Sequence, residues 1–154
     1  MVILYYSRSS KTKIFAEALG ELLSQPVHEL VCDLNGYTGI KFLFKAVPLV
    51  FTGKVYPVSN MPEAVPDEIY LCCPVWGGQM ASPAKYFLDK MDLKGKTVNI
   101  LLTAGTPVEK YRQNALNYLT KNISCNPGEA YIFTSHKPEK EIIKEQLRDL
   151  MPNM

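Results

Sequence analysis

Hydroxyl and cationic side chains crowd one short segment near the start of the chain. Four hydroxyls and three cations fall within seven residues, Ser7-Arg8-Ser9-Ser10-Lys11-Thr12-Lys13. A helix N-terminus presents unpaired N–H groups and about half a positive charge, so hydroxyls and amides that converge there bind anions. One hydroxyl would be enough to cap the following helix. The excess therefore predicts a phosphate-binding loop, with simple capping as the alternative.

A second segment joins the single tryptophan of the chain to two glycines, in the run Pro74-Val75-Trp76-Gly77-Gly78-Gln79. Glycine lets a backbone approach a flat ligand closely, and an indole offers a large face for stacking. The alternative is a turn with a half-buried Trp76. A third and weaker signal is the small polar segment Thr103-Ala104-Gly105-Thr106. Together the three segments favour a mononucleotide with a planar ring as the ligand.

Several other chemistries are disfavoured by missing motifs. Neither the Walker pattern GxxxxGK[ST] nor the dinucleotide pattern GxGxxG occurs, which argues against nucleoside triphosphates and against tightly bound NAD. The four cysteines lack CxxC spacing, and His28 and His136 lie far from them, so no metal site is expected. Cys72 and Cys73 stand in an apolar run, which is typical of buried free thiols. No protein general base or nucleophile stands out.

Apolar runs and helical stripes alternate along the chain, and these elements must position the three segments. Strands are expected at 2–6, 27–34, 69–73, 97–102 and 129–133. Helices are expected at 14–23, 38–51, 82–91, 108–121 and 139–150, with Ile142 on the inner face of the last. Ser82 followed by Pro83 predicts an N-cap and a first helical residue. A long irregular stretch separates the second helix from the third strand.

This alternation predicts one domain, residues 1–154, with a three-layer α/β/α doubly wound fold and a parallel sheet. Ligands of such sheets bind beyond the carboxyl ends of the strands, near the point where the strand order reverses. The three segments follow the first, third and fourth expected strands. We therefore expect them to meet at this edge of the sheet.

The same residues resemble the flavodoxin-like FMN-binding proteins, and the likeness covers most of the chain. The first segment is similar to the family pattern Y-S-x-T/S-G-x-T. The second is similar to P-x-W-x-G-x-x-x-P, here Pro74, Trp76, Gly78 and Ser82-Pro83. The resemblance implies a five-stranded parallel sheet in the order 2-1-3-4-5 with FMN at the switch point. It also implies the short-chain form, because the fifth strand lacks the long insertion of other relatives.

The resemblance further implies which residues hold the cofactor. The FMN phosphate would be bound by Ser7, Ser9, Ser10, Lys11 and Thr12, with the backbone of Arg8. One side of the isoalloxazine would be lined by Pro74, Val75, Trp76, Gly77 and Gly78, with Trp76 as the stacking residue. The polar edge of the ring would contact Thr103, Ala104 and Gly105. The flavin would supply the redox chemistry, and the protein would supply binding and electrostatics.

Two neighbouring positions depart from the family pattern. The glycine of the phosphate loop is Ser10 here, and the asparagine after it is Lys11. If the loop requires a positive φ at this position, Ser10 is strained or the loop is reshaped. Lys11 would add positive charge next to the phosphate.

Charge helps to choose among the functions of this family. The net charge is +2 and the pI is about 8.3, whereas flavodoxins that carry electrons are usually acidic. We therefore expect a small flavoprotein oxidoreductase that passes electrons from NAD(P)H to a quinone or a similar acceptor. A single-electron carrier that works with a redox partner protein is one alternative, and a flavin-free interaction module is the other. The charges are interspersed, so no nucleic-acid partner is expected.

The sequence also bears on location and assembly. The start MVILYYSRSS lacks a basic region followed by a long apolar core, and no stretch approaches the roughly 20 apolar residues of a membrane span. A cytoplasmic protein without a membrane partner is therefore expected. Residues 40–51 are expected to form an unusually apolar helix. This helix is either a homodimer interface or a helix packed beneath the loop that follows it.

Overall fold

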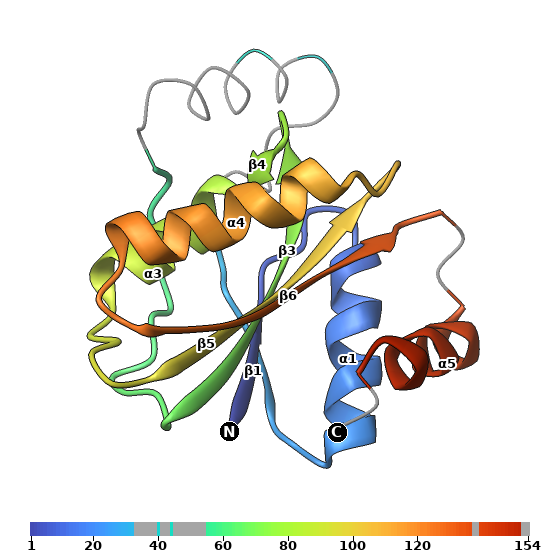
Figure 1. The fold of residues 1–154 in the computed structure, drawn as a ribbon, viewed down its shortest axis with the longest axis horizontal. Coiled ribbons are helices and arrows are strands. Elements are labelled where there is room, and N and C mark those ends of the chain that lie inside the picture. The colour runs from blue at the N-terminus through green and yellow to red at the C-terminus, as the bar shows by residue number, and fades with distance from the viewer. Residues whose placement is uncertain (33–39, 41–43, 45–54, 137–138, 152–154) are drawn as a thin grey trace.

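A central sheet lies between two helical layers in the computed structural model, which describes residues 1–32, 40, 44, 55–136 and 139–151 (Figure 1). The elements in chain order are β1 (Val2–Tyr5), α1 (Lys11–Leu23), β2 (Val27–Glu29), β3 (Glu68–Trp76), β4 (Gln79–Met80), α3 (Ser82–Lys90), β5 (Thr97–Ala104), α4 (Glu109–Asn122), β6 (Asn126–Thr134) and α5 (Lys140–Leu150). Among the described residues, no helix combines the length and apolarity that crossing a membrane requires.

The five parallel strands are ordered β2-β1-β3-β5-β6, which confirms the predicted doubly wound sheet and its 2-1-3-4-5 order. The chain runs from β1 outward to β2 and then returns to place β3 on the other side of β1. This reversal is the switch point of the sheet. The strand β4 lies off this path and pairs antiparallel with the end of β3.

The strands of the sheet centre are buried on both faces, as continuous apolar runs predict. Alternate side chains enter different cores. Leu4 and Tyr6 of the first strand region pack toward α3 and α4, and Ile3 packs toward α1 and α5. Figure 1 shows these helix pairs on opposite faces of the sheet. The free thiols of Cys72 and Cys73 are fully buried in the two cores, and burial raises the pKa of Cys73 to about 12.

Most strand boundaries differ from the prediction by a few residues: β1 ends at Tyr5, β5 continues to Ala104 and β6 covers Asn126–Thr134. The differences in the second and third strands have a physical cause. The second strand covers only Val27–Glu29, because β1 pairs with it over three residues at the sheet edge. The third strand does not end before Pro74 but continues to Trp76. Register with β1 ends at the pair Tyr5 and Cys72, so the missing N–H of Pro74 removes no hydrogen bond to β1. The last residues of β3 pair with β4 instead.

Two helix predictions also need correction. Ser82 is the first residue of α3 rather than its N-cap, and its Oγ accepts a 2.6 Å hydrogen bond from the backbone N–H of Tyr56. The loop before β3 therefore uses the hydroxyl that was expected to cap the helix. In α5, Ile142 is 49% exposed, while Ile143 and Leu147 are buried. The buried stripe of α5 begins one residue later than predicted.

The apolar helix expected at 38–51 lies outside the described residues, apart from Ile40 and Phe44, which are 69% and 75% exposed. The homodimer interface predicted for this segment stays a prediction.

The return from α1 to β2 requires a close approach of backbone to side chain at Gly20. A Cβ added there would lie 2.4 Å from Cγ2 of Val27 and 3.2 Å from the carbonyl oxygen of Gln25. Gly20 itself is buried and accepts the C-cap N–H of Ser24. Gly20 therefore fixes how α1 sits against the sheet edge, although glycine is unfavourable inside a helix.

We expect Gly20→Ala to lower the free energy of unfolding by about 1–3 kcal/mol, because overpacking against Val27 outweighs the gain of up to about 1 kcal/mol from helix propensity. Urea denaturation monitored by circular dichroism measures the change. Asn117→Ala on the exposed side of α4 is the control, since it improves helix propensity without a new contact. A Gly20→Ala protein that gains stability as this control does would contradict the packing argument.

Candidate functional site

A cavity of about 230 Å³ opens at the carboxyl edge of the sheet, beside the switch point between β1 and β3. The loops and strand ends that follow β1, β3, β5 and β6 line it with Arg8, Ser9, Lys11, Thr12, Pro74, Val75, Trp76, Thr103, Ala104, Gly105 and Ser135. Members of all three predicted segments are therefore brought together. The shared edge of a parallel sheet explains why residues so distant in sequence meet.

The lining also differs from the predicted set. Ser7, Ser10, Gly77 and Gly78 lie in the same loops but do not line the cavity. Ser135 lines it and was not predicted. Its N–H donates to the carbonyl of Ala104 at 2.7 Å, which holds the loop after β6 against the end of β5. The only sequence signal for Ser135 was its place near the end of a strand, which was predicted to end at Phe133 and ends at Thr134.

Ser10 adopts the left-handed conformation, with φ 61° and ψ −5°. This is the positive φ that the family glycine would supply without strain, and for other residues it costs about 1–2 kcal/mol. Ser10 is the N-cap of α1, yet its side chain makes no capping hydrogen bond. Simple helix capping therefore does not explain why a hydroxyl stands here.

The charges at the start of α1 oppose the usual arrangement. Helices favour acidic residues in the first turn, because the backbone dipole is positive there. The helices α4 and α5 follow this rule, with Glu109 and Glu141 in their first turns. The first turn of α1 contains no acid and instead carries Lys11 and Lys13. The positive end of the helix and these lysines together favour a bound anion.

The two lysines differ in their surroundings. Lys13 lies 3.9 Å from Glu17 in an i,i+4 salt bridge, and it does not line the cavity. Lys11 is exposed and lines the cavity, and the described residues offer it no salt bridge. Lys11 is therefore the lysine placed to meet an anion in the cavity.

Three hydroxyls add hydrogen-bonding capacity to this region. The Oγ1 atoms of Thr12 and Thr103 lie 2.8 Å apart in a buried hydrogen bond that links α1 to β5. Either hydroxyl can donate, so one proton of the pair stays available to a ligand. The Oγ of Ser7 is buried and has no partner within the described part of the chain. An anion held at this loop would satisfy it.

Trp76 is more deeply packed than either sequence interpretation expected. It is 8% exposed, and the ring of Tyr6 meets it edge-on, with centroids 5.6 Å apart and an interplanar angle of 87°. Most of the indole therefore belongs to the core, and its remaining surface lines the cavity. Stacking of a ligand on Trp76 stays a prediction, and this packing leaves little of the ring surface exposed.

Gly77 and Gly78 form the turn of a hairpin between β3 and β4. Their φ values are 56° and 79°, as a two-residue type I′ turn requires. A Cβ added at Gly78 would lie 3.4 Å from Cε1 of Tyr111 in α4. Glycine is therefore required here by the positive φ of the turn, and Gly78 faces a helix of the protein itself.

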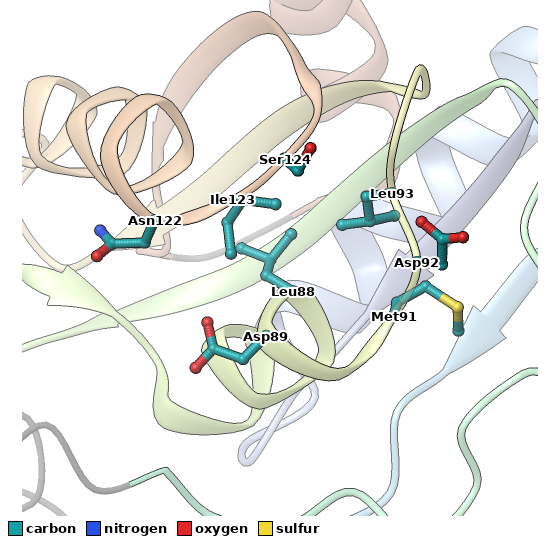
Figure 2. Close-up of a pocket in the computed structure, with 8 residues that line it drawn as sticks. All are labelled: Leu88, Asp89, Met91, Asp92, Leu93, Asn122, Ile123 and Ser124. Atoms are coloured by element: carbon teal, nitrogen blue, oxygen red, sulfur yellow. The ribbon is translucent and has the colours of Figure 1, made fainter.

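A larger hollow of about 420 Å³ lies at the other ends of α3 and α4 (Figure 2). The carboxylates of Asp89 and Asp92 point away from one another, with Leu88, Leu93 and Ile123 between them. Asp89 already accepts a 2.6 Å hydrogen bond from the hydroxyl of Tyr118. No group of possible metal ligands gathers among the described residues. Polar groups converge at the carboxyl edge instead, and we place the candidate site there.

The strand order and the position of the cavity define a flavodoxin-like α/β fold. No family model and no curated protein matches the sequence.

Solved structures show the same fold. A candidate flavoprotein from Bacteroides uniformis is 19% identical over 96% of each chain, with a TM-score of 0.77. A Lactobacillus acidophilus flavoprotein, solved in complex with FMN, is 24% identical over 85% of this chain and 91% of its own, with a TM-score of 0.69. An NAD(P)H:quinone oxidoreductase from Methanothermobacter marburgensis is 16% identical over 99% of this chain and 94% of its own, with a TM-score of 0.55.

We expect Ser10→Gly to raise the free energy of unfolding by roughly 0.5–1 kcal/mol, because relief of strain outweighs the added freedom of glycine in the unfolded chain. Ser24 provides a matched control, since it has φ 51° at the other end of α1 and lies outside the cavity. Ser24→Gly should stabilise the protein similarly. Urea denaturation of both variants measures the effect. A loss of stability confined to Ser10→Gly would show that the Ser10 side chain stabilises the loop.

Proposed function

We propose that the cavity at the carboxyl edge binds FMN and that the protein is a small FMN-dependent oxidoreductase acting between NAD(P)H and a quinone or similar acceptor. The observation that carries the proposal is the start of α1. Cations replace acids in its first turn, Ser10 holds a strained backbone, and the buried Ser7 hydroxyl has no partner among the described residues. Each feature is unfavourable by itself and favourable for holding a phosphate.

The phosphate would lie over the N-terminus of α1. Lys11 would supply charge, and the backbone N–H groups at the start of the helix would donate hydrogen bonds. The hydroxyl of the Thr12–Thr103 pair that does not donate to the other would donate one more. These donors come from one loop and one neighbouring strand, which suits a compact phosphate dianion better than an extended ligand.

The flavin ring would lie toward the ends of β3 and β5. Pro74, Val75 and the edge of Trp76 form one wall, and Thr103–Gly105 form the other. The cavity of about 230 Å³ is smaller than the roughly 300–1,000 Å³ of typical small-molecule pockets, so it would enclose part of the mononucleotide. The remainder would lie over the exposed residues Arg8, Ser9 and Gly105. The FMN complex of the Lactobacillus acidophilus protein supports this choice of ligand.

When bound, FMN would supply hydride and electron transfer, which needs no acid or base from the protein. The described residues provide the rest. The helix and Lys11 would balance the phosphate charge, the Thr103–Gly105 strand end would meet the polar edge of the ring, and the packed Trp76 would exclude water from one side. The mildly basic chain favours a small acceptor over docking to a basic redox partner. The named activity of the Methanothermobacter marburgensis protein supports the same reaction class.

We expect Lys11→Ala to weaken FMN binding roughly tenfold, because it removes a charge placed to contact the phosphate. Lys13→Ala is the matched control. It makes the same charge change in the same helical turn, but Lys13 pairs with Glu17 outside the cavity. Titration of flavin fluorescence measures both affinities. Riboflavin, which lacks the phosphate, should bind both variants and the wild-type protein equally. Equal losses in the two variants would contradict the assigned role of Lys11.

Turnover separates the oxidoreductase from its two alternatives. The FMN-loaded protein should oxidise NADH or NADPH when a quinone is added. The fall in absorbance of the reduced nicotinamide measures this turnover. Turnover that needs an added reductase protein would instead indicate a single-electron carrier. A purified protein that is colourless and shows no saturable binding of added FMN would overturn the proposal and favour an interaction module.

A further inference from the structure

The hairpin formed by the end of β3 and by β4 is too short to be stable by itself. The strand β4 contains two residues, which pair with Val75 and Trp76 across the Gly77–Gly78 turn. A two-stranded hairpin is at best marginally stable in water, and this one lies off the main path of the sheet. Contacts from elsewhere in the molecule must therefore fix it.

The helix α4 provides two of these contacts. The side-chain amide of Asn114 donates a 2.9 Å hydrogen bond to the carbonyl oxygen of Gly78. One helical turn earlier, the ring of Tyr111 lies beside Gly78, where an added Cβ would be at van der Waals distance, 3.4 Å, from Cε1. Residues three apart share one face of a helix, so α4 presents both groups to the turn together. Figure 1 shows α4 running beside β4.

The same hairpin determines where the indole lies. Trp76 directly precedes the turn, and its ring is held edge-on against Tyr6 while its remaining surface lines the cavity. Movement of Gly78 would move Gln79 and, through the ladder pair, Trp76 itself. The wall of the cavity on the β3 side is therefore connected to α4 through one hydrogen bond and one ring contact.

We propose that Asn114 is a positioning residue, which holds the Gly78 carbonyl and thereby sets Trp76 against the cavity. Asn114 does not line the cavity and is not a catalytic residue. Its amide supplies both the reach and the N–H donor that the Gly78 carbonyl needs. The consequence for the flavin ring rests on the proposed function, whereas the effect on Trp76 does not.

The single tryptophan of the chain makes the proposal measurable without any ligand. In Asn114→Ala, loss of one hydrogen bond should raise the population of displaced hairpin roughly fivefold. We expect red-shifted tryptophan emission and a larger iodide quenching constant. Asn114→Gln, which keeps the donor on a longer side chain, should restore much of the wild-type signal. Asn117→Ala in the exposed face of the same helix is the control and should match the wild-type protein.

Asn114→Asp is a second variant in case Asn114→Ala does not fold, because it keeps the side-chain shape and replaces the amide donor with a carboxylate. Far-UV circular dichroism confirms that each variant is folded. Emission and iodide quenching that stay at the wild-type level in folded Asn114→Ala or Asn114→Asp would overturn the positioning role.

Flavin titration then tests the connection to the cavity. Asn114→Ala should weaken the binding of both FMN and riboflavin, because it disturbs the ring side, whereas Lys11→Ala affects FMN alone. If the wild-type protein binds neither flavin, the proposed function fails while the tryptophan result still decides the role of Asn114. If Trp76 responds but both flavins bind Asn114→Ala as they bind the wild-type protein, the link from Asn114 to the cavity is refuted.

Discussion

The parallel register of β1, β3 and β5 is the constraint on which the candidate site depends. Tyr5 is level with Cys72, and two residues further along β3, Pro74 is level with Thr103. The loops that follow the three strands therefore leave the same edge of the sheet, beside the switch point. A shift of one residue would turn every side chain to the opposite face of the sheet. It would also separate the hydroxyl of Thr103 from the N-terminus of α1.

The first turn of α1 lowers the stability of the fold through the same features that would bind an anion. Strained backbone, cations at the positive end of a helix and a buried hydroxyl without a described partner all oppose folding. The rest of the structure compensates with two well-filled cores and with an ion-pair network in which Glu21 of α1 meets Lys140 and Lys144 of α5. At the start of α1, local rules are broken where function is expected.

Much of the fold could be predicted from the sequence, because continuous apolar runs and helical stripes report burial directly. The polar loop before α1 was equally visible, as was the consequence of Ser10 replacing glycine. The errors involve partners that are distant in sequence. The sequence around Ser82 does not reveal that its hydroxyl accepts a hydrogen bond from the N–H of Tyr56. The sequence around Gly78 likewise does not reveal that its carbonyl accepts one from Asn114 of α4. The two residues of β4 are too few to show a period, so the hairpin was not predicted.

The hydroxyl pair of Thr12 and Thr103 has a consequence for what the cavity wall can recognise. Both oxygens are already placed 2.8 Å apart, and rotation about two C–O bonds reverses which one donates. The hydroxyl hydrogen that is not used between the two threonines can therefore point to a ligand from Thr12 on the helix or from Thr103 on the strand, without any movement of heavy atoms. This part of the cavity wall can both donate and accept a hydrogen bond. It can follow a ligand oxygen that changes its protonation or its position, at the cost of a hydroxyl rotation alone.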